Sequence, residues 1–270
     1  MDIKRISSSI IAIIALAVIL LMPSVFITGI LFTVITFVAM NEYLKAISKV
    51  CNPVKWVAYL SCIIVAIINY IPQQYMNLVI MGAIPTILLL LFSQVIATDM
   101  KIRFKDMAYT FLGICYIPGF LMYLSLINGM ENGKILLGYT FIAAWMTDTI
   151  AYCVGVKFGK HKFSKVSPKK SIEGCISGTI GAVLLMILYT FILNNYFSFN
   201  FPYLIIGISS LILSLIGQIG DFSASCIKRY VDIKDYGNIL PGHGGILDRI
   251  DSVLFIAPFA YMLFNMLIRF

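Results

Sequence analysis

The chain has 270 residues, of which 60% are hydrophobic and only 12% are charged, and its mean hydropathy is +0.96. An average globular chain is about 45–50% apolar and about 25% charged, so this composition excludes a water-soluble enzyme and indicates an integral membrane protein. The formal net charge of +8 comes without a basic soluble module. It therefore argues against nucleic-acid binding and for attraction to anionic membrane lipids.

The apolar runs predict about nine transmembrane helices, because a span needs about 20 residues. Residues 7–40 form a stretch too long for a single span, and we predict two helices that turn near Pro23. The other seven predicted helices cover residues 54–71, 76–97, 106–127, 134–154, 173–194, 201–220 and 251–268. The expected fold is an all-α polytopic membrane protein with a single membrane-embedded domain over residues 1–270.

The basic residues predict how these helices are oriented. With the N-terminus in the cytoplasm, nine alternating spans place 18 of the 20 Lys and Arg residues on the inner side and leave only Lys134 and Arg269 outside. The positive-inside rule describes this asymmetry. We therefore expect the C-terminus outside, the polar segments 155–172 and 221–250 on the cytoplasmic side, and the protein in the cytoplasmic (inner) membrane.

Residues 217–251 concentrate the polar chemistry, with five of the 12 carboxylates, four of the 20 Lys and Arg residues and one of the two His residues. We expect Asp221 to close one helix and Asp248 to open the next. Consecutive antiparallel helices return to the same membrane face, so the two carboxylates can converge. Carboxylate oxygens suit Mg²⁺, and a pair of such ions can hold the attacking and leaving oxygens of a nucleotidyl transfer. The sequence therefore predicts Asp221 and Asp248 as metal ligands.

The residues between these aspartates can neutralise and hold phosphate groups. Lys228, Arg229 and Lys234 are suited to phosphate charge, and the glycines of residues 241–245 let backbone N–H groups approach a ligand closely. The alternative is a solvated inner loop in which the basic residues only anchor the topology and His243 is a turn residue. The combination of acids, bases and glycines in one loop favours a nucleotide site.

Asp148 is a carboxylate inside the apolar run 134–154, four to six residues from its expected inner end. An acid within a membrane helix costs about 2.5–3.5 kcal/mol in insertion measurements, so we expect it to face a substrate cavity. The alternative is a structural hydrogen bond to a neighbouring helix.

The basic segment 167–174 leads into the helix predicted at residues 173–194. Lysines and hydroxyls at a helix N-terminus are typical of an anion site, because the helix dipole and free N–H groups add to their charge. We therefore predict that Lys169, Lys170 and Ser171 bind a phosphate of the nucleotide or the lipid. The alternative is a basic inner loop in which Ser171 only caps the helix.

Three pieces of the sequence together resemble the signature of the phosphatidate cytidylyltransferase, or CDP-diacylglycerol synthase, family. They are Ser225-Cys226-Ile227-Lys228-Arg229, Lys234-Asp235 and residues 240–251, which read L-P-G-H-G-G-I-L-D-R-I-D. The run D-T-x-A-Y at Asp148 resembles a second motif of the family. The first 130 residues resemble it only in hydropathy, and we expect them to serve as scaffold or dimerisation helices, with residues 131–270 catalytic.

The resemblance implies an enzyme that joins CTP and phosphatidate to give CDP-diacylglycerol and pyrophosphate, as a homodimer. It implies two Mg²⁺ ions, with or without an assisting monovalent cation, held by Asp221 and Asp248. We assign catalytic roles to these two aspartates together with Lys228 and Arg229. The expected substrate-binding residues are Asp148, Lys169, Lys170, Ser171, Ser225, Lys234, Asp235, His243, Gly244, Gly245, Arg249 and Asp251.

Other functions remain as alternatives. A CTP-dependent polyprenol kinase or a CDP synthase acting on an ether lipid would need similar residues. An ion-coupled transporter would use Asp148 as its ion site, but the chain shows no paired broken helices with matching half-chain symmetry. A purely structural scaffold gives no reason for the loop of acids and glycines.

Overall fold

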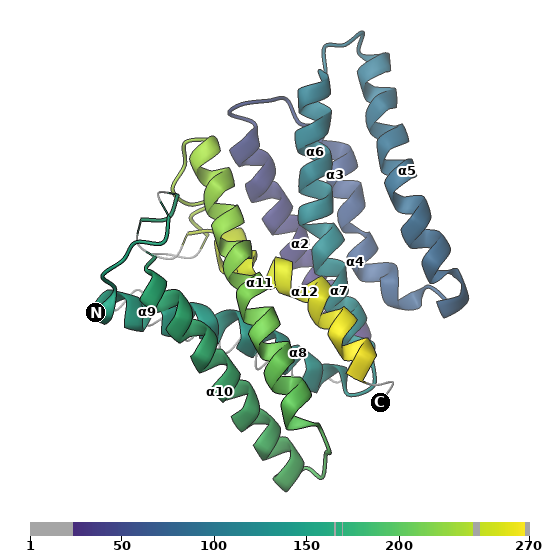
Figure 1. Ribbon diagram of the computed structural model, residues 1–270. Helices are drawn as coiled ribbons and strands as arrows, with labels where there is room; N and C mark the ends of the chain where they lie inside the picture. Colours follow the sequence, from purple (N-terminus) through teal and green to yellow (C-terminus); the bar gives the residue numbers. More distant parts are fainter. Residues whose placement is uncertain (1–23, 165, 169, 240–243, 268–270) are drawn as a thin grey trace. The chain divides into compact units, whose positions relative to one another are not determined.

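In a computed structural model of the protein, residues 24–164, 166–168, 170–239 and 244–267 are described, and they are almost entirely helical (Figure 1). No β-strand forms within these ranges, where an isolated bridge joins Lys162 and Ser171. The all-α prediction is confirmed for this part of the chain. The elements are α2 (Val25–Ile47), α3 (Lys55–Cys62), α4 (Ile64–Ile67), η1 (Ile68–Tyr70), α5 (Gln73–Ala97), α6 (Phe104–Tyr116), α7 (Pro118–Asn128), α8 (Gly133–Phe141), η2 (Ile142–Met146), α9 (Thr147–Phe158), α10 (Ile172–Tyr196), α11 (Tyr203–Tyr230) and α12 (Leu247–Leu267).

Within the described residues, six helical segments are long and apolar enough to cross a membrane, so the protein is an integral membrane protein. They are Val25–Ile47, Gln74–Ala97, Phe104–Asn128, Gly133–Phe158, Ile172–Tyr196 and Tyr203–Tyr230. The count of nine is not confirmed. The first predicted helix falls on residues 1–23, outside the described residues, and the run 54–71 forms the short helices α3, α4 and η1. The orientation of the termini stays a prediction.

The helix α11 is longer than the sequence predicted. It continues to Tyr230, so Asp221 lies within the helix and does not close it. The reason is a polar inward face: Ser214, Gln218, Ser225 and Lys228 are all buried and recur at helical spacing. Because these buried residues are polar, hydropathy alone predicts an end of the helix that is too early. The predicted loop 221–250 accordingly shortens to residues 231–246.

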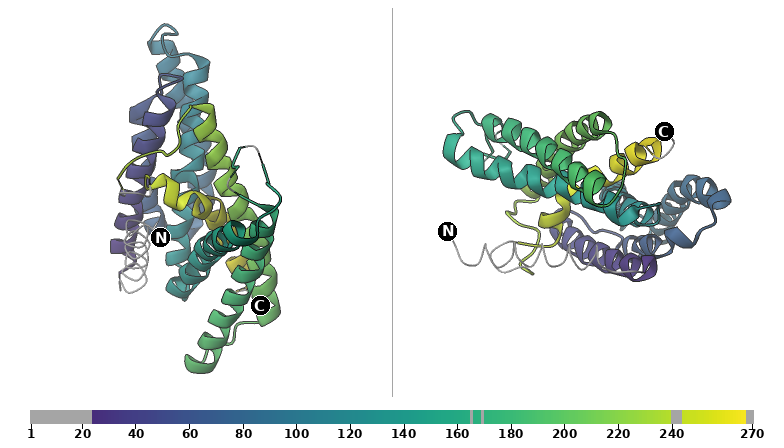
Figure 2. Two further views of the ribbon diagram at one scale, coloured as in Figure 1. Left: turned by 90° about the vertical axis from the view of Figure 1, so that its left-hand side faces the viewer. Right: turned by 90° about the horizontal axis from the view of Figure 1, so that it is seen from below.

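One compact unit contains the described residues up to Met130 together with Tyr230–Arg249. In it α2 packs against α3, α4, α6 and α7, and α5 lies at the outer edge beside α6 (Figures 1 and 2). The core includes the fully buried Tyr43, whose hydroxyl donates to the carbonyl of Tyr109 at 2.9 Å. Most of α5 exposes apolar side chains, among them Leu78 and Met81, as expected of a surface that faces lipid.

A second unit contains Glu131–Arg229 and the chain from Ile250 onward. Its helices α9 and α10 lie side by side (Figures 1 and 2) and approach closely at glycines. A Cβ added to Gly174 would lie 2.6 Å from the carbonyl oxygen of Ala151, and one added to Gly178 would lie 2.6 Å from that of Thr147. Small residues at such positions let membrane helices pack backbone to backbone.

Replacing Gly178 with alanine should therefore destabilise the protein. The added methyl group meets backbone that cannot move aside, and overpacking of this kind costs about 1–3 kcal/mol. Thermal unfolding in detergent should show a lower midpoint. The matched control is Gly82→Ala on α5, where an added Cβ meets nothing within 4 Å. Equal midpoints for the two variants would contradict the close packing of α9 on α10.

Candidate active site

Three carboxylates and two lysines gather in the second unit. Asp148 comes from α9, Asp221 and Lys228 from α11, and Asp251 from α12. Lys170 forms an ion pair with Asp221, and it also feels the charges of Asp148 and Asp251. The charges of Asp221, Asp148 and Lys228 act in turn on Asp251. We call Asp148, Asp221 and Asp251 the acidic cluster.

Lys170 is the counter-ion of the acidic cluster. Burial lowers the pKa of its ammonium group, but attraction to Asp221 and Asp148, the hydrogen bond to Asp221 and the charge of Asp251 outweigh burial. The pKa of Lys170 therefore lies above its usual value, and the side chain is charged at any physiological pH. The cluster thus holds a cation among three carboxylates, the arrangement that buried charges need.

A short hairpin between α9 and α10 presents Lys170 to α11. Lys162 and Ser171 form its antiparallel bridge, and the N–H of Phe163 donates to the carbonyl of Lys170 at 3.1 Å. The ring of Phe163 stacks on that of Phe222 with centroids 4.7 Å apart, and Lys170 Nζ lies 4.6 Å from the centroid of the Phe222 ring. The hairpin therefore contacts α11 at Phe222, directly after Asp221.

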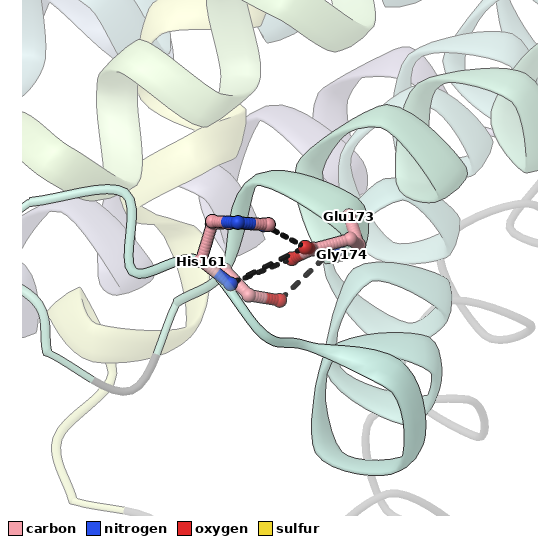
Figure 3. A network of polar contacts seen from close by, with 4 residues as sticks. His161, Glu173 and Gly174 are labelled. Atoms are coloured by element: carbon pink, nitrogen blue, oxygen red, sulfur yellow. Dashed lines mark hydrogen bonds and ion pairs between the residues drawn. The ribbon is translucent and has the colours of Figure 1, made fainter.

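The base of this hairpin is tied to the first turn of α10. Figure 3 shows His161 and Glu173, whose carboxylate accepts from the backbone N–H of His161 at 3.2 Å and lies 2.7 Å from the ring Nδ1. The Ile172 N–H donates to the carbonyl of His161 at 3.0 Å. Ser171 is buried and caps α10 by accepting from the N–H of Gly174 at 3.2 Å. Ser171 thus caps the helix, and its predicted phosphate contact stays a prediction.

Asp148 lies deeper in its helix than predicted. Because α9 continues to Phe158, Asp148 is ten positions before the helix end, or about 15 Å at 1.5 Å per residue. It lies two residues after the π-helical turn η2, which ends at Met146, and such widened turns are common at functional sites. Its carboxylate accepts from the Ser252 hydroxyl at 2.6 Å, so α9 is bonded to α12 at this point.

Next to these residues, hydroxyl and amide groups join three helices. Thr147 Oγ1 donates to Ser214 Oγ at 2.9 Å, and Ser214 donates to Thr179 Oγ1 at 3.2 Å. Gln218 donates from Nε2 to the same Thr179 oxygen at 2.8 Å and to the carbonyl of Cys175 at 3.2 Å. This network holds α9, α10 and α11 together one turn or less from Asp148 and Asp221.

A groove of about 820 Å³ lies between α10 and α11, and Phe163 and Phe222 are among the residues that line it. Its lining is mostly aliphatic. Of the polar residues that line it, Thr179 and Gln218 hydrogen-bond to each other. A surface of this kind suits hydrocarbon and offers little to a nucleotide.

In the first unit, Asp248 holds the loop that precedes α12. It is the second residue of α12, and its Oδ2 accepts from the N–H of Tyr236 at 2.8 Å and of Gly245 at 3.0 Å. Gly244 has φ +81°, and a Cβ there would lie 2.9 Å from the same oxygen. Only glycine takes this left-handed conformation at little cost, so the backbone can approach Asp248 closely here, and its predicted approach to a ligand stays a prediction.

Comparison with known proteins identifies the family of this chain. A model of the Cytidylyltransferase family matches residues 3–267. The chain belongs to this family. The phosphatidate cytidylyltransferase of Bacillus subtilis (strain 168) is 38% identical over 164 residues, which cover 60% of this chain and 58% of that protein. The phosphatidate cytidylyltransferase of Staphylococcus aureus (strain COL) is 32% identical over 232 residues, which cover 83% of this chain and 85% of that protein.

A third relative, the phosphatidate cytidylyltransferase of Staphylococcus haemolyticus (strain JCSC1435), is 37% identical over 170 residues, which cover 63% of each protein. The Bacillus subtilis and Staphylococcus haemolyticus alignments thus span less than two thirds of the relatives' own length. The family resemblance predicted from the sequence is confirmed.

The predicted site residues of this chain fall into three groups. Those brought together in the second unit are Asp148, Lys170, Asp221, Lys228 and Asp251, while Ser225 is buried and Arg229 exposed on the same α11. Those around the loop of the first unit are Asp235, Gly244, Gly245 and Asp248, with Lys234 and Arg249 exposed. Lys169 and His243 lie outside the described residues. Asp221 and Asp248 are in different units, so their convergence stays a prediction.

Sequence reasoning missed Ser252, which binds Asp148, and Glu42, a buried acid of α2 whose carboxylate accepts from the N–H groups of Ile246 and Leu247. A signal for Glu42 was present, because it is an acid within a long apolar run. The rule that drew attention to Asp148 applies equally to it.

Replacing Lys170 with methionine should destabilise the protein and make its stability depend on divalent cations. The acidic cluster would lose its counter-ion, and breaking a buried ion pair costs about 3–5 kcal/mol; here we expect somewhat less, because both side chains are about 22% exposed. Thermal unfolding should show a lower midpoint that added Mg²⁺ raises more than it raises the wild-type midpoint. Lys162→Met, an exposed position on the same hairpin, is the control. Identical responses of the two variants to Mg²⁺ would contradict this role of Lys170.

Proposed function

We propose that this protein transfers the cytidylyl group of CTP to phosphatidate, giving CDP-diacylglycerol and pyrophosphate. Its relatives are named phosphatidate cytidylyltransferases. The observation that carries the proposal is the acidic cluster with its bound Lys170, built within an apolar helical unit from three helices and a hairpin. Buried charge at this density is costly and is a mark of a functional site in a membrane protein.

We propose that Asp221 and Asp248 hold Mg²⁺. Within the described ranges, no three His, Cys, Asp or Glu side chains are arranged to hold a metal ion, but Mg²⁺ commonly takes only one or two carboxylates and completes its shell with phosphate oxygens and water. Asp221 belongs to a cluster that already surrounds a cation. Asp248 lies at the start of α12, where its carboxylate accepts from the N–H groups of Tyr236 and Gly245. The chemistry that bound ions supply is neutralisation of the triphosphate and of the departing pyrophosphate.

In the proposed reaction, a phosphate oxygen of phosphatidate, already ionised near neutral pH, attacks the α-phosphorus of CTP. A new P–O bond forms at the α-phosphorus. The bond from this phosphorus to the oxygen that bridges the α- and β-phosphates breaks, and pyrophosphate leaves. The step needs no Ser or Cys nucleophile and no strong base. The role of the chain is to position the two phosphates, with Lys170, Lys228 and Arg229 offsetting negative charge as it develops.

We further propose that the site faces the cytoplasm, that anionic lipids surround this face, and that the enzyme works as a homodimer. The charge asymmetry of the sequence supports the first two points. The acyl chains would remain in hydrocarbon while the headgroup meets CTP at the membrane surface.

One assay separates this reaction from its rivals. Purified protein receives CTP labelled in the cytidine, phosphatidate and Mg²⁺. We expect label in the lipid and pyrophosphate in equal amount. A polyprenol kinase would release labelled CDP, an ether-lipid synthase would need the ether analogue, and a transporter would form no product from CTP. Any of these three results would replace the proposed function.

Asp221→Asn and Asp248→Asn should each lower Mg²⁺-dependent formation of CDP-diacylglycerol by about 100-fold or more, because preorganised charge at a reacting phosphate is worth that much. The variants should still insert into membranes, since Asn keeps the volume of Asp. Near-normal turnover in both would overturn the metal assignment.

Asp148→Asn should also impair turnover, because it removes one charge of the acidic cluster while keeping an acceptor for the Ser252 hydroxyl. The comparison is Lys134→Gln, which changes a charge in the same unit at the first turn of α8. If initial rates show the two variants equally active, Asp148 is a structural residue only.

A further inference from the structure

Glu42 is a buried carboxylate in the first described membrane helix. It lies five positions before the end of α2, and 3% of the residue is exposed. Its Oε1 accepts from the N–H of Ile246 at 3.0 Å, and its Oε2 accepts from the N–H of Leu247 at 2.8 Å. Leu247 is the first residue of α12, and Ile246 is the residue before it. The first N–H groups of a helix have no partner within that helix, so Glu42 supplies the partners from another segment of the chain.

The loop before α12 is shaped around this carboxylate. A Cβ added to Gly237 would lie 2.4 Å from Glu42 Oε1, and one added to Gly245 would lie 2.4 Å from Oε2. Glycine at both positions therefore lets the backbone approach Glu42 from two sides. The contact is electrostatically sound as well, because a carboxylate stabilises the positive end of the helix dipole.

Glu42 and Asp248 bind the same loop at adjacent donors. Asp248 accepts from the N–H groups of Tyr236 and Gly245, and Glu42 accepts from the next two N–H groups, those of Ile246 and Leu247. The backbone that carries Asp248 is thus fixed immediately before it. Without Glu42, Asp248 would still be present, but the turn at Ile246 and Leu247 that orients its side chain would lose its hydrogen-bond acceptor.

We infer that Glu42 is a positioning residue for Asp248 and sets the affinity of the enzyme for Mg²⁺ and CTP more than its maximal rate. This inference rests on the proposed function, in which Asp248 binds the cation. When the loop is no longer fixed, ligand binding must order it. The free energy of ordering then weakens the apparent affinity for the ligand. Saturating ligand restores the ordered loop, so turnover at saturation changes less.

The first test measures the loop itself, without any reaction. Glu42→Gln keeps the size of the side chain but turns an amide N–H₂ toward one of the two backbone donors. Hydrogen exchange of the Ile246 and Leu247 amides in detergent should become about tenfold faster or more, the effect of losing one hydrogen bond to a charged group. Unchanged exchange at both amides would overturn the inference.

The control is Asp106→Asn. Asp106 is also buried in the first unit, and it accepts from the N–H groups of Asn52 and Arg103, both at 2.7 Å. It therefore has the same chemistry as Glu42 but holds a different loop. Its variant should speed exchange at Asn52 and Arg103 and leave Ile246 and Leu247 unchanged. Faster exchange at all four amides in both variants would mean general destabilisation and would overturn the inference.

The second test measures steady-state kinetics. Glu42→Gln should raise the KM for CTP and the half-saturating Mg²⁺ concentration by about tenfold, with kcat at saturation within about threefold of wild type. Gly237→Ala, which pushes on Glu42 from the loop, should shift both constants in the same direction. A decrease in kcat with both half-saturation constants unchanged would overturn the inference. Changes in these constants equal to those of Asp106→Asn would overturn it as well. If wild-type protein makes no CDP-diacylglycerol, the proposed function fails, while hydrogen exchange still decides whether Glu42 holds the loop.

Discussion

The acidic side chains that this protein keeps inside apolar helices must each find partners, and much of the structure around the site follows from that need. An ionised carboxylate in a membrane helix is tolerated only where hydrogen bonds or opposite charge replace water. Asp221 meets this need with Lys170, and Asp148 with the Ser252 hydroxyl. Glu42 meets it with the first N–H groups of α12. Each solution joins segments that are far apart in the sequence.

Glycines make these solutions possible by letting backbone come close. At Gly178 and Gly174 the backbones of α9 and α10 come close together. The hairpin that joins these two helices contacts α11 at Phe222. At Gly237 and Gly245 the loop before α12 closes on Glu42. Gly245, a glycine of the signature, therefore serves the fold of the loop, a role that the sequence pattern alone does not distinguish from ligand binding.

The sequence predicted the membrane class, most of the long helices and the residues of the acidic cluster, because hydropathy and local motifs carry that information. It predicted the end of α11 wrongly, since Ser225 and Lys228 look like loop residues until their helical spacing is matched with buried partners. It placed Asp148 too near a helix end for a similar reason, because Lys157 made the last turn of α9 look like a loop. Partners such as Ser252 for Asp148 depend on packing between distant helices, which no local pattern records.

The two proposed metal ligands differ in the partners that they hold, and the difference bears on how a cation would enter. Asp221 is paired with a lysine side chain, which is flexible and can move to a substrate phosphate when another cation takes its place. Asp248 is bonded to backbone N–H groups, which cannot leave without unfolding the loop. We therefore expect Asp221 to exchange its partner on binding and Asp248 to keep its own. We therefore expect the loop before α12 to keep its conformation when a ligand binds, and the Lys170 hairpin to change its contacts.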